Sequence, residues 1–267
     1  MSQEIALITG ASSGIGLELA HLFASKGYSL ILVAQNREKL DAAANYLKTQ
    51  YQVPIRVIYK NLSRPESGDE IVNELQGYKV RISVLVNNAG FSNYGKFSEI
   101  PVENQINQIN TNITTLTKLT RLILPYMIMA KSGKILNVAS TAAFQPGPLM
   151  AVYYASKAYV LSFSEALASE LIGTGVTVTA LCPGPTATGF QKRAEMLNSK
   201  LMDVGLMDVK DVAKAGFEGL TKGKTVVIPG IRNKIMSFLV RFLPRNLVTR
   251  IVKQAQEKKD KVENSKL

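Results

Sequence analysis

The residues best suited to chemistry in this sequence are a tyrosine and a lysine four positions apart, Tyr153 and Lys157. In a helix this spacing puts both side chains on one face. A fixed ammonium favours the phenolate, so we expect the lysine to lower the pKa of the tyrosine from about 10 toward the range of a working proton donor. The pair alone fits equally well a half-buried tyrosine beside a solvated lysine, so the hypothesis depends on the rest of the chain.

A glycine-rich turn near the N-terminus is the second candidate site. Its sequence, Thr-Gly-Ala-Ser-Ser-Gly-Ile-Gly, covers residues 9–16 and lies between an apolar run at 4–9 and a helical pattern at 17–26. Glycines allow a tight turn and close approach of the backbone to a pyrophosphate, whose charge the N-terminus of the next helix attracts. A glycine triplet between a strand and a helix therefore predicts a dinucleotide site, with a merely tight turn as the alternative.

The elements that must position these residues alternate along the chain. Short apolar runs predict strands at 4–9, 29–34, 55–59, 82–86, 134–138, 176–181 and 225–228. Helical patterns separate them at 17–26, 37–50, 67–76, 102–131, 151–172 and 209–222. Such alternation predicts an α/β fold, a Rossmann-like doubly wound parallel sheet of about seven strands with helices on both faces. We expect a single dinucleotide-binding and catalytic domain at 1–230, followed by a basic amphipathic extension at 231–267.

Composition narrows the possible chemistry. The 267 residues suffice for one α/β domain, and 46% hydrophobic with 19% charged residues describe a globular protein. A single cysteine, Cys182, rules out an internal disulfide. A single histidine, His21, argues against a catalytic triad or a multi-histidine metal site, so no metal is expected. The chain enters a strand almost at once and no apolar run could span a bilayer, so we expect a cytoplasmic protein.

The motifs occur together in an order that is typical of one family. The glycine turn is followed by Asn-Asn-Ala-Gly at 87–90, by Ser140, and by the Tyr153 and Lys157 pair. This combination resembles the short, single-domain members of the short-chain dehydrogenase/reductase superfamily over about residues 4–230, and it is more specific than any one part. The resemblance implies a seven-stranded parallel sheet, a nicotinamide dinucleotide across its C-terminal edge, and reversible reduction of a carbonyl group.

The resemblance also assigns catalytic roles. Tyr153 matches the family's acid/base, and Lys157 matches the lysine that lowers its pKa and holds the nicotinamide ribose. Ser140, thirteen residues before the tyrosine, matches the serine that binds the substrate oxygen, although it could equally cap a turn. Asn110 matches the asparagine that holds a water of a proton relay, with a polar residue that breaks a helix as the alternative.

The cofactor site implied by the resemblance comes from several loops. Its residues are Gly10, Ser12, Ser13, Gly14, Ile15, Gly16, Gln35, Arg37, Asn61, Leu62, Asn88, Ala89, Gly90, Tyr153, Lys157, Pro183, Gly184, Thr186 and Thr188. The loop at 183–188 would line the nicotinamide. Cys182 beside it fits a small buried residue better than a nucleophile.

The end of the second predicted strand indicates which coenzyme is used. An NAD enzyme places Asp or Glu there to accept from the ribose 2′-hydroxyl. Here the chain has Gln35 and Arg37, with no carboxylate before Glu38, which favours NADP(H) over NAD(H). Asn61 stands where the family usually has an aspartate that contacts the adenine amino group, and an amide oxygen can still accept that hydrogen bond.

Two further segments bear on substrate and partners. The segment at 190–207, where the family carries its substrate lid, holds the apolar residues Met196, Leu197, Leu201, Met202, Leu206 and Met207. They suit an apolar substrate (a lipid, acyl or steroid-like ketone), or simply packing of the lid on the core. The net charge is +12, and residues 231–267 hold ten Lys/Arg against three acidic residues.

The extension predicts two basic amphipathic helices divided at Pro244. Its apolar and basic residues are Ile235, Phe238, Leu239, Phe242, Leu247, Val248, Ile251 and Val252 with Arg241, Arg245, Arg250 and Lys253. Such helices fit peripheral contact with a membrane or a partner, or packing on the fold or across a dimer. Nucleic acid is not expected, because no aromatic residues interleave with a basic stripe.

We therefore predict an NADP(H)-preferring oxidoreductase that interconverts a small-molecule ketone or aldehyde and the corresponding alcohol. The alternatives are a non-enzymatic dinucleotide sensor, which would usually lack the Tyr153 and Lys157 pair, and a membrane-associated scaffold that works through the extension. The family pattern further implies a homodimer or homotetramer packed through the helices at 102–131 and 151–172.

Overall fold

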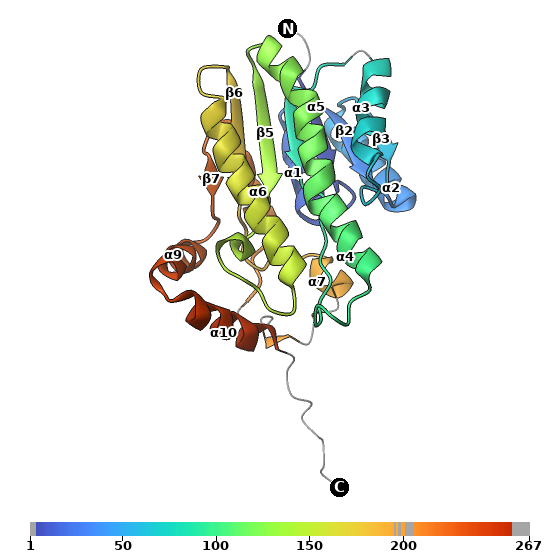
Figure 1. The fold of residues 1–267 in the computed structure, drawn as a ribbon. Helices are drawn as coiled ribbons and strands as arrows, with labels where there is room; N and C mark the ends of the chain where they lie inside the picture. The colour runs from blue at the N-terminus through green and yellow to red at the C-terminus, as the bar shows by residue number, and fades with distance from the viewer. Residues whose placement is uncertain (1–3, 79, 195, 197–198, 201–204, 258–267) are drawn as a thin grey trace.

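Seven parallel strands form one sheet in the computed structural model, which describes residues 4–78, 80–194, 196, 199–200 and 205–257. They are β1 (Ile5–Thr9), β2 (Ser29–Ala34), β3 (Ile55–Tyr59), β4 (Val84–Asn87), β5 (Gly133–Val138), β6 (Val176–Leu181) and β7 (Val226–Val227). Their order, β3-β2-β1-β4-β5-β6-β7, reverses between β1 and β4, where a crevice opens at the carboxyl ends of the strands. The predicted fold is confirmed (Figure 1).

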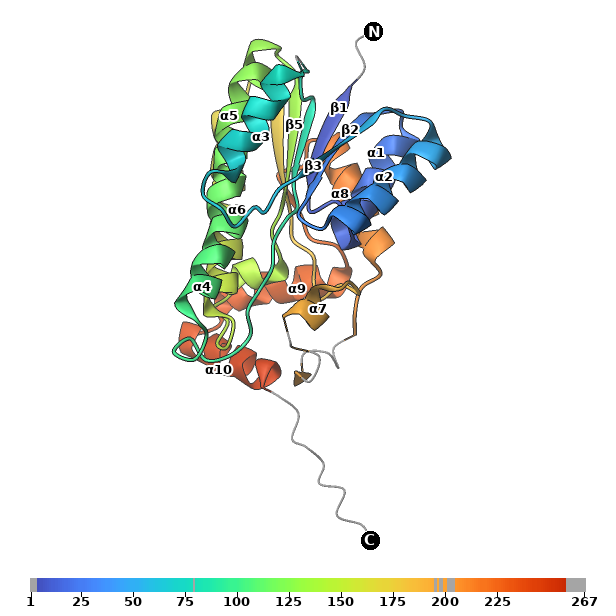
Figure 2. The same cartoon turned by 90° about the vertical axis from the view of Figure 1, so that its right-hand side faces the viewer.

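Alternating side chains of the buried strands supply a core on each face of the sheet. In β1, Ala6 and Ile8 belong to one cluster, whereas Leu7 belongs to the cluster on the opposite face, because neighbouring strand residues point to opposite sides. Figure 2 shows α1 (Gly14–Ser25), α2 (Arg37–Tyr51) and α8 (Val209–Thr221) on one side of the sheet. On the other side lie α3 (Ser67–Gly77), α5 (Thr115–Met129) and α6 (Ala151–Glu170).

The helix expected at 102–131 is interrupted. It consists of α4 (Val102–Ile109), a π-helical turn at Asn110–Thr114, and α5. Two side chains of this region bond to the loop after β3: Asn110 Nδ2 donates to Ser63 O at 3.0 Å, and Thr115 Oγ1 donates to Leu62 O at 2.8 Å. A π-turn admits one extra residue and is frequent at functional sites, because it redirects the side chains beside it.

The C-terminal extension forms two helices at the carboxyl edge of the sheet. α9 (Ile231–Leu239) leads through a 3₁₀ turn at Val240–Phe242 into α10 (Arg245–Gln256), and Pro244 directly precedes α10 as predicted. The inner side of α10 packs on the fold, since Val248 and Gln256 are buried. None of the helices that the structure describes is long and apolar enough to cross a membrane.

Candidate active site

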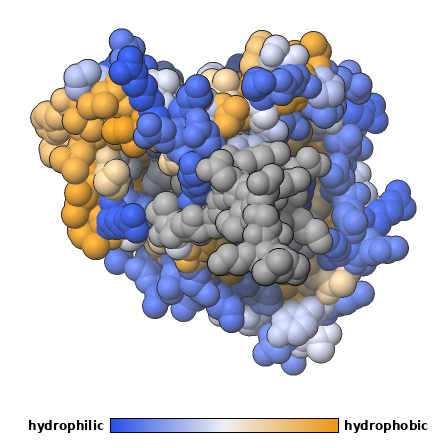
Figure 3. Space-filling view, turned by 90° about the horizontal axis from the view of Figure 1, so that it is seen from below, coloured by the Kyte–Doolittle hydropathy of each residue, from blue (hydrophilic) through white to orange (hydrophobic). Residues whose placement is uncertain are grey.

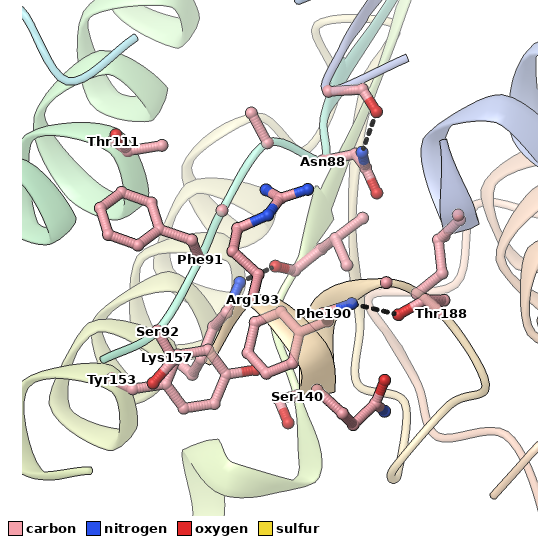
Figure 4. A pocket seen from close by; sticks show the side chains of 18 of the residues that line it. Asn88, Phe91, Ser92, Thr111, Ser140, Tyr153, Lys157, Thr188, Phe190 and Arg193 are labelled. Carbon is pink, nitrogen blue, oxygen red and sulfur yellow. Dashed lines mark hydrogen bonds between the residues drawn. The ribbon is translucent and has the colours of Figure 1, made fainter. Parts of the chain in front are cut away.

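The turn after β1 and the loop after β4 are joined by four hydrogen bonds. The hydroxyl of Thr9 accepts from the backbone N–H groups of Asn88 and Ala89, both at 3.0 Å. The side-chain amide of Asn88 donates to Thr9 O at 2.9 Å and to Gly10 O at 3.2 Å (Figure 4). Gly10 has a φ of +66°, and a Cβ there would lie 2.8 Å from Asn88 Nδ2. Glycine is therefore required at this position both by the backbone conformation and by the space.

The N-terminus of α1 is open to an anion. Ser13, the residue before the helix, makes no side-chain cap, so the first N–H groups of α1 keep their donors free of side-chain partners. Ser12, Ser13 and Gly14 line a cavity of about 810 Å³ that runs along the carboxyl ends of the strands. Gly16 does not line it; a Cβ on Gly16 would lie 2.4 Å from Gly10 O, so this glycine lets helix and turn pack closely. The turn thus has the shape that a pyrophosphate needs.

A chain of buried amides ties the sheet to the helices behind it. Asn87 Nδ2 donates to Thr120 Oγ1 at 3.0 Å and to Asn137 Oδ1 at 2.9 Å. Asn137 Nδ2 in turn donates to Ser164 Oγ at 2.9 Å. These bonds connect β4, β5, α5 and α6, so the helix that carries the tyrosine and lysine is fixed against the central strands.

Tyr153 and Lys157 lie in the first two turns of α6 and share a face, as predicted. The ammonium of Lys157 donates to Val138 O at 2.7 Å and lies 5.7 Å from the centroid of the Tyr153 ring. Burial lowers the pKa of Lys157 to about 8. Burial also raises the pKa of Tyr153 well above its ordinary value, and a hydrogen bond with Ser140 offsets only part of that rise. The expected lowering of the tyrosine pKa is therefore not found, because desolvation of the phenolate outweighs the hydrogen bond that favours it.

Ser140 has two functions in this geometry. Its hydroxyl precedes the 3₁₀ turn Thr141–Phe144, accepts from Ala142 N at 3.1 Å, and donates to Pro183 O at 3.4 Å. The same side chain is hydrogen-bonded to the phenol of Tyr153. The serine is thus both the cap of a turn and the neighbour of the tyrosine hydroxyl, so a carbonyl oxygen placed there would meet two O–H groups.

Asn110 does not join this cluster, contrary to the prediction. Its amide donates to Ser63 O at 3.0 Å, and it does not line the cavity. Asn112, two residues further, is buried instead beside the lysine: a Cβ on Gly90 would lie 3.1 Å from Asn112 Oδ1 and 3.4 Å from Lys157 Nζ. The π-helical turn therefore brings Asn112 next to Lys157, in the place where the resemblance led us to expect Asn110.

Comparison with known proteins is consistent with this geometry. The model of the short chain dehydrogenase family matches residues 4–197. The chain belongs to this family. It is therefore an oxidoreductase, of a family whose members use a nicotinamide dinucleotide.

Three similar proteins illustrate the range of the family. A very-long-chain 3-oxoacyl-CoA reductase of Phaeosphaeria nodorum is 39% identical over 191 residues, which cover 70% of this chain and 56% of that protein. A short-chain dehydrogenase of Sphingobium yanoikuyae in complex with NADPH has a TM-score of 0.79 at 32% identity, covering 90% of this chain and 94% of the other. A 7β-hydroxysteroid dehydrogenase has a TM-score of 0.84 at 26% identity, covering 93% and 96%. Solved relatives hold NADPH or NAD, so family membership does not select between them.

The end of β2, where short-chain dehydrogenases choose their coenzyme, presents two lysines that the sequence analysis did not include. Gln35 lines the cavity as predicted, together with Lys39 and Lys60. Arg37 does not line the cavity, contrary to the prediction: its guanidinium stacks over the Tyr59 ring, 4.7 Å from the centroid. Helix α2 begins at Arg37, which turns this side chain away and brings Lys39 round to the cavity.

Asn61 and Leu62 line the same end of the cavity. The side-chain oxygen of Asn61 accepts from the N–H of Ser63 at 3.1 Å and from its hydroxyl at 2.9 Å. An amide oxygen has two lone pairs. The turn therefore already uses the acceptor that we expected to meet an adenine amino group, and that contact requires one of these bonds to be released.

The loop after β6 and the short helix α7 (Phe190–Arg193) cover the tyrosine. Pro183, Gly184, Thr186 and Thr188 line the cavity, and Thr188 Oγ1 accepts from Phe190 N at 3.2 Å (Figure 4). The Phe190 ring lies 5.3 Å from the Tyr153 ring, centroid to centroid, a contact that no sequence pattern predicted.

Just before this loop, Cys182 is buried, and burial raises the pKa of its thiol to about 12. The thiolate is the nucleophilic form of cysteine. Cys182 therefore behaves as a small apolar residue, as expected.

The far end of the cavity is apolar and closed by the C-terminal helix. Met150, Tyr154 and Met196 form a buried cluster against which Val252 of α10 packs. Gln256, 1% exposed, donates through Nε2 to Tyr154 Oη at 2.6 Å and lines the cavity. Of the predicted lid residues, Met207 packs on the main core and Leu206 is exposed, while Leu197, Leu201 and Met202 lie outside the described residues.

Proposed function

We propose that the chain catalyses the reversible reduction of an apolar ketone or aldehyde to an alcohol, and that it prefers NADP(H) to NAD(H) as coenzyme. The observation that carries the proposal is a buried phenol, Tyr153, hydrogen-bonded to Ser140 and sharing a helix face with Lys157 in one cavity with the open N-terminus of α1. A structural tyrosine would not need this setting.

The residues present fit a dinucleotide. The turn at Gly10 leaves no room for a side chain, and the uncapped first turn of α1 would hold the phosphates. Lys157, between Val138 O and the open side of Gly90, would hold the nicotinamide ribose. When bound, the dinucleotide supplies or accepts the hydride.

The chain's own part in the reaction is the proton. Because burial raises the pKa of Tyr153, its phenol is protonated at neutral pH and can donate to the carbonyl oxygen as negative charge develops there. The single O–H of Ser140 would turn from Pro183 O to donate a second hydrogen bond to the same oxygen, and the Lys157 ammonium would stabilise the phenolate left behind. Asn112, buried next to Lys157, would hold the water through which the lysine exchanges protons with solvent.

The coenzyme preference rests on charge at the end of β2. A carboxylate there would repel a 2′-phosphate, and none lines this part of the cavity among the described residues. Gln35 offers an amide, and Lys39 and Lys60 offer ammonium groups that attract the phosphate. Lys60 forms an ion pair with Glu70 at 3.1 Å, so Lys39 is expected to contribute more to the binding of the 2′-phosphate.

The substrate class and the assembly follow from apolar surfaces. Met150, Tyr154, Phe190 and Met196 surround the substrate end, which favours a lipid, acyl or steroid-like carbonyl compound. The reductase and hydroxysteroid dehydrogenase among the similar proteins support this class. Exposed Met129 on α5 supports a homodimer or homotetramer packed through α5 and α6.

The proposal is tested by coenzyme oxidation with aliphatic, acyl and cyclic ketones, using NADPH and NADH in parallel. Tyr153→Phe should lower kcat by about a thousandfold, the usual loss of a general acid, while the dissociation constant of NADPH changes less than about twofold because the phenol does not hold the phosphates. Unchanged turnover in Tyr153→Phe would refute the catalytic assignment. Tighter binding of NADH than of NADPH would refute the coenzyme preference.

A further inference from the structure

The outer surface of α9 and α10 exposes an unusual number of large apolar side chains. They are Ile231, Ile235, Met236, Phe238, Leu239, Phe242, Leu243, Leu247 and Ile251, here called the α9–α10 face. Phe242 is 70% exposed and Phe238 58%, and their rings pack on each other at 5.1 Å instead of on the core. Figure 3 shows apolar surface gathered at the left of the molecule, the side on which Figure 1 places α9 and the start of α10. Contiguous exposed apolar surface of this kind marks an interaction site.

The same two helices are strongly basic. They expose six cationic side chains and contain no acidic residue between Ile231 and Gln256; the cations are Arg232, Lys234, Arg241, Arg245, Arg250 and Lys253. Apolar side chains flanked by lysine and arginine match a surface that has hydrocarbon beneath a layer of negative charge.

We propose that the α9–α10 face binds the surface of an anionic lipid bilayer, with Phe238 and Phe242 inserted at the level of the acyl chains. A second copy of the chain fits less well. A two-fold contact through this face would bring its basic side chains against a second face that has no acidic residue to pair with them, and like charges in contact oppose association. Negatively charged headgroups would instead neutralise them, at about 1 kcal/mol, or about fivefold in affinity, for each basic side chain.

The face and the substrate cavity are connected through α10. Its outer side carries Leu247 and Ile251, whereas its inner side carries Val252 and Gln256, which close the apolar end of the cavity. An apolar ketone dissolved in a bilayer would therefore lie next to the end of the cavity that receives it. This last step rests on the proposed function, but binding to the bilayer does not.

Flotation of the full-length chain with vesicles tests the binding. We expect capture by vesicles of phosphatidylcholine with phosphatidylserine, weak capture by phosphatidylcholine alone, and release by salt. Phe238→Ser with Phe242→Ser should weaken binding by about a hundredfold, since each buried phenylalanine contributes about tenfold. Arg241→Glu with Arg245→Glu should weaken binding by at least about 25-fold.

Matched controls lie on other surfaces. Tyr46→Ser removes a side chain that is 59% exposed on α2, and Lys222→Glu reverses an exposed charge just after α8; both should bind within about twofold of wild type. Thermal melting confirms that each variant is folded. The proposal is overturned if anionic vesicles do not capture the wild type, or if the paired variants bind like the controls. It is also overturned if the serine pair only converts a dimer into a monomer, which would make a second copy the occupant.

Activity provides a second readout. With a ketone dissolved in the vesicles, the serine pair should lose rate in proportion to its lost binding, whereas with a water-soluble ketone it should match wild type. Rates that fall equally with both ketones would contradict the link between bilayer and cavity. Absence of turnover with every ketone would refute the proposed function while leaving the vesicle result intact.

Discussion

The cofactor end of the cavity is held by hydrogen bonds that use backbone atoms, whereas the substrate end is held by contacts between side chains. At the first, each bond that joins Thr9 or Gly10 to Asn88 has a main-chain atom at one end, and a Cβ added to Gly10 would lie 2.8 Å from the Asn88 amide and 3.0 Å from the backbone of Ala89. At the second, Tyr154 meets Gln256 across 102 positions through side-chain atoms alone. The cofactor end should therefore be intolerant of substitution, whereas side chains at the substrate end should be able to rearrange around a substitution.

Gly16→Ala is expected to have the largest effect of the substitutions at the cofactor end. Its Cβ would lie 2.4 Å from Gly10 O, so α1 must move away from the turn that forms the phosphate site. We expect NADPH affinity to fall by about a hundredfold and stability by about 2–3 kcal/mol, the scale of an overpacked core, measured by titration and urea unfolding. Gly77→Ala is the control, because a Cβ there meets nothing within 4 Å. Similar losses in both variants would contradict the proposed role of close packing.

Asn112→Ala and Asn110→Ala form a pair that locates the functional asparagine. Asn112 makes three buried or half-buried hydrogen bonds, two with the backbone of Phe91 and one with Ser156 Oγ. Its loss should cost about 1–3 kcal/mol of stability and should lower turnover through the lysine beside it. Asn110 makes one backbone bond at Ser63, so its loss should cost less than about 1 kcal/mol. Melting curves and kcat of the two variants show which asparagine is functional. A larger loss of kcat in Asn110→Ala than in Asn112→Ala would favour Asn110 as the asparagine of the proton relay.

Much of the fold and part of the site could be predicted from local patterns. Short apolar runs predict the buried strands, and glycines between a strand and a helix predict the phosphate turn. Asn112 was missed because two asparagines stand two positions apart in a helical pattern, and only the π-turn decides which one faces the lysine. Phe190 and Gln256 were missed because their contacts join distant segments. The pKa of Tyr153 was misjudged because its charged neighbour is visible in the sequence and its burial is not.

The burial of Lys157 can be tested through the pH dependence of stability. Its pKa is lowered to about 8, so above this pH the folded chain has released a proton that the unfolded chain keeps up to about 10.5. Stability attributable to this group therefore rises with pH across that window, by at most about 1.4 kcal/mol per pH unit. Between about pH 8 and about pH 9.5, the unfolding free energy of wild type should gain about 1–2 kcal/mol over that of Lys157→Met. A constant difference would show that the lysine is solvated.

Gln256→Ala gives the smallest expected effect and probes the end that should adjust. Its amide holds Tyr154, the residue after the proposed proton donor, and its side chain forms part of the cavity wall, so removing it should loosen substrate contacts but not the phosphate turn. We expect KM for a bulky ketone to rise about fivefold, the worth of one neutral hydrogen bond, with the dissociation constant of NADPH unchanged. Gln254→Ala, exposed on the same helix, is the control. If truncation after Gly230 left KM as low as in wild type, the C-terminal helix would not be a wall of the substrate site, and the contrast between the two ends would lose its basis.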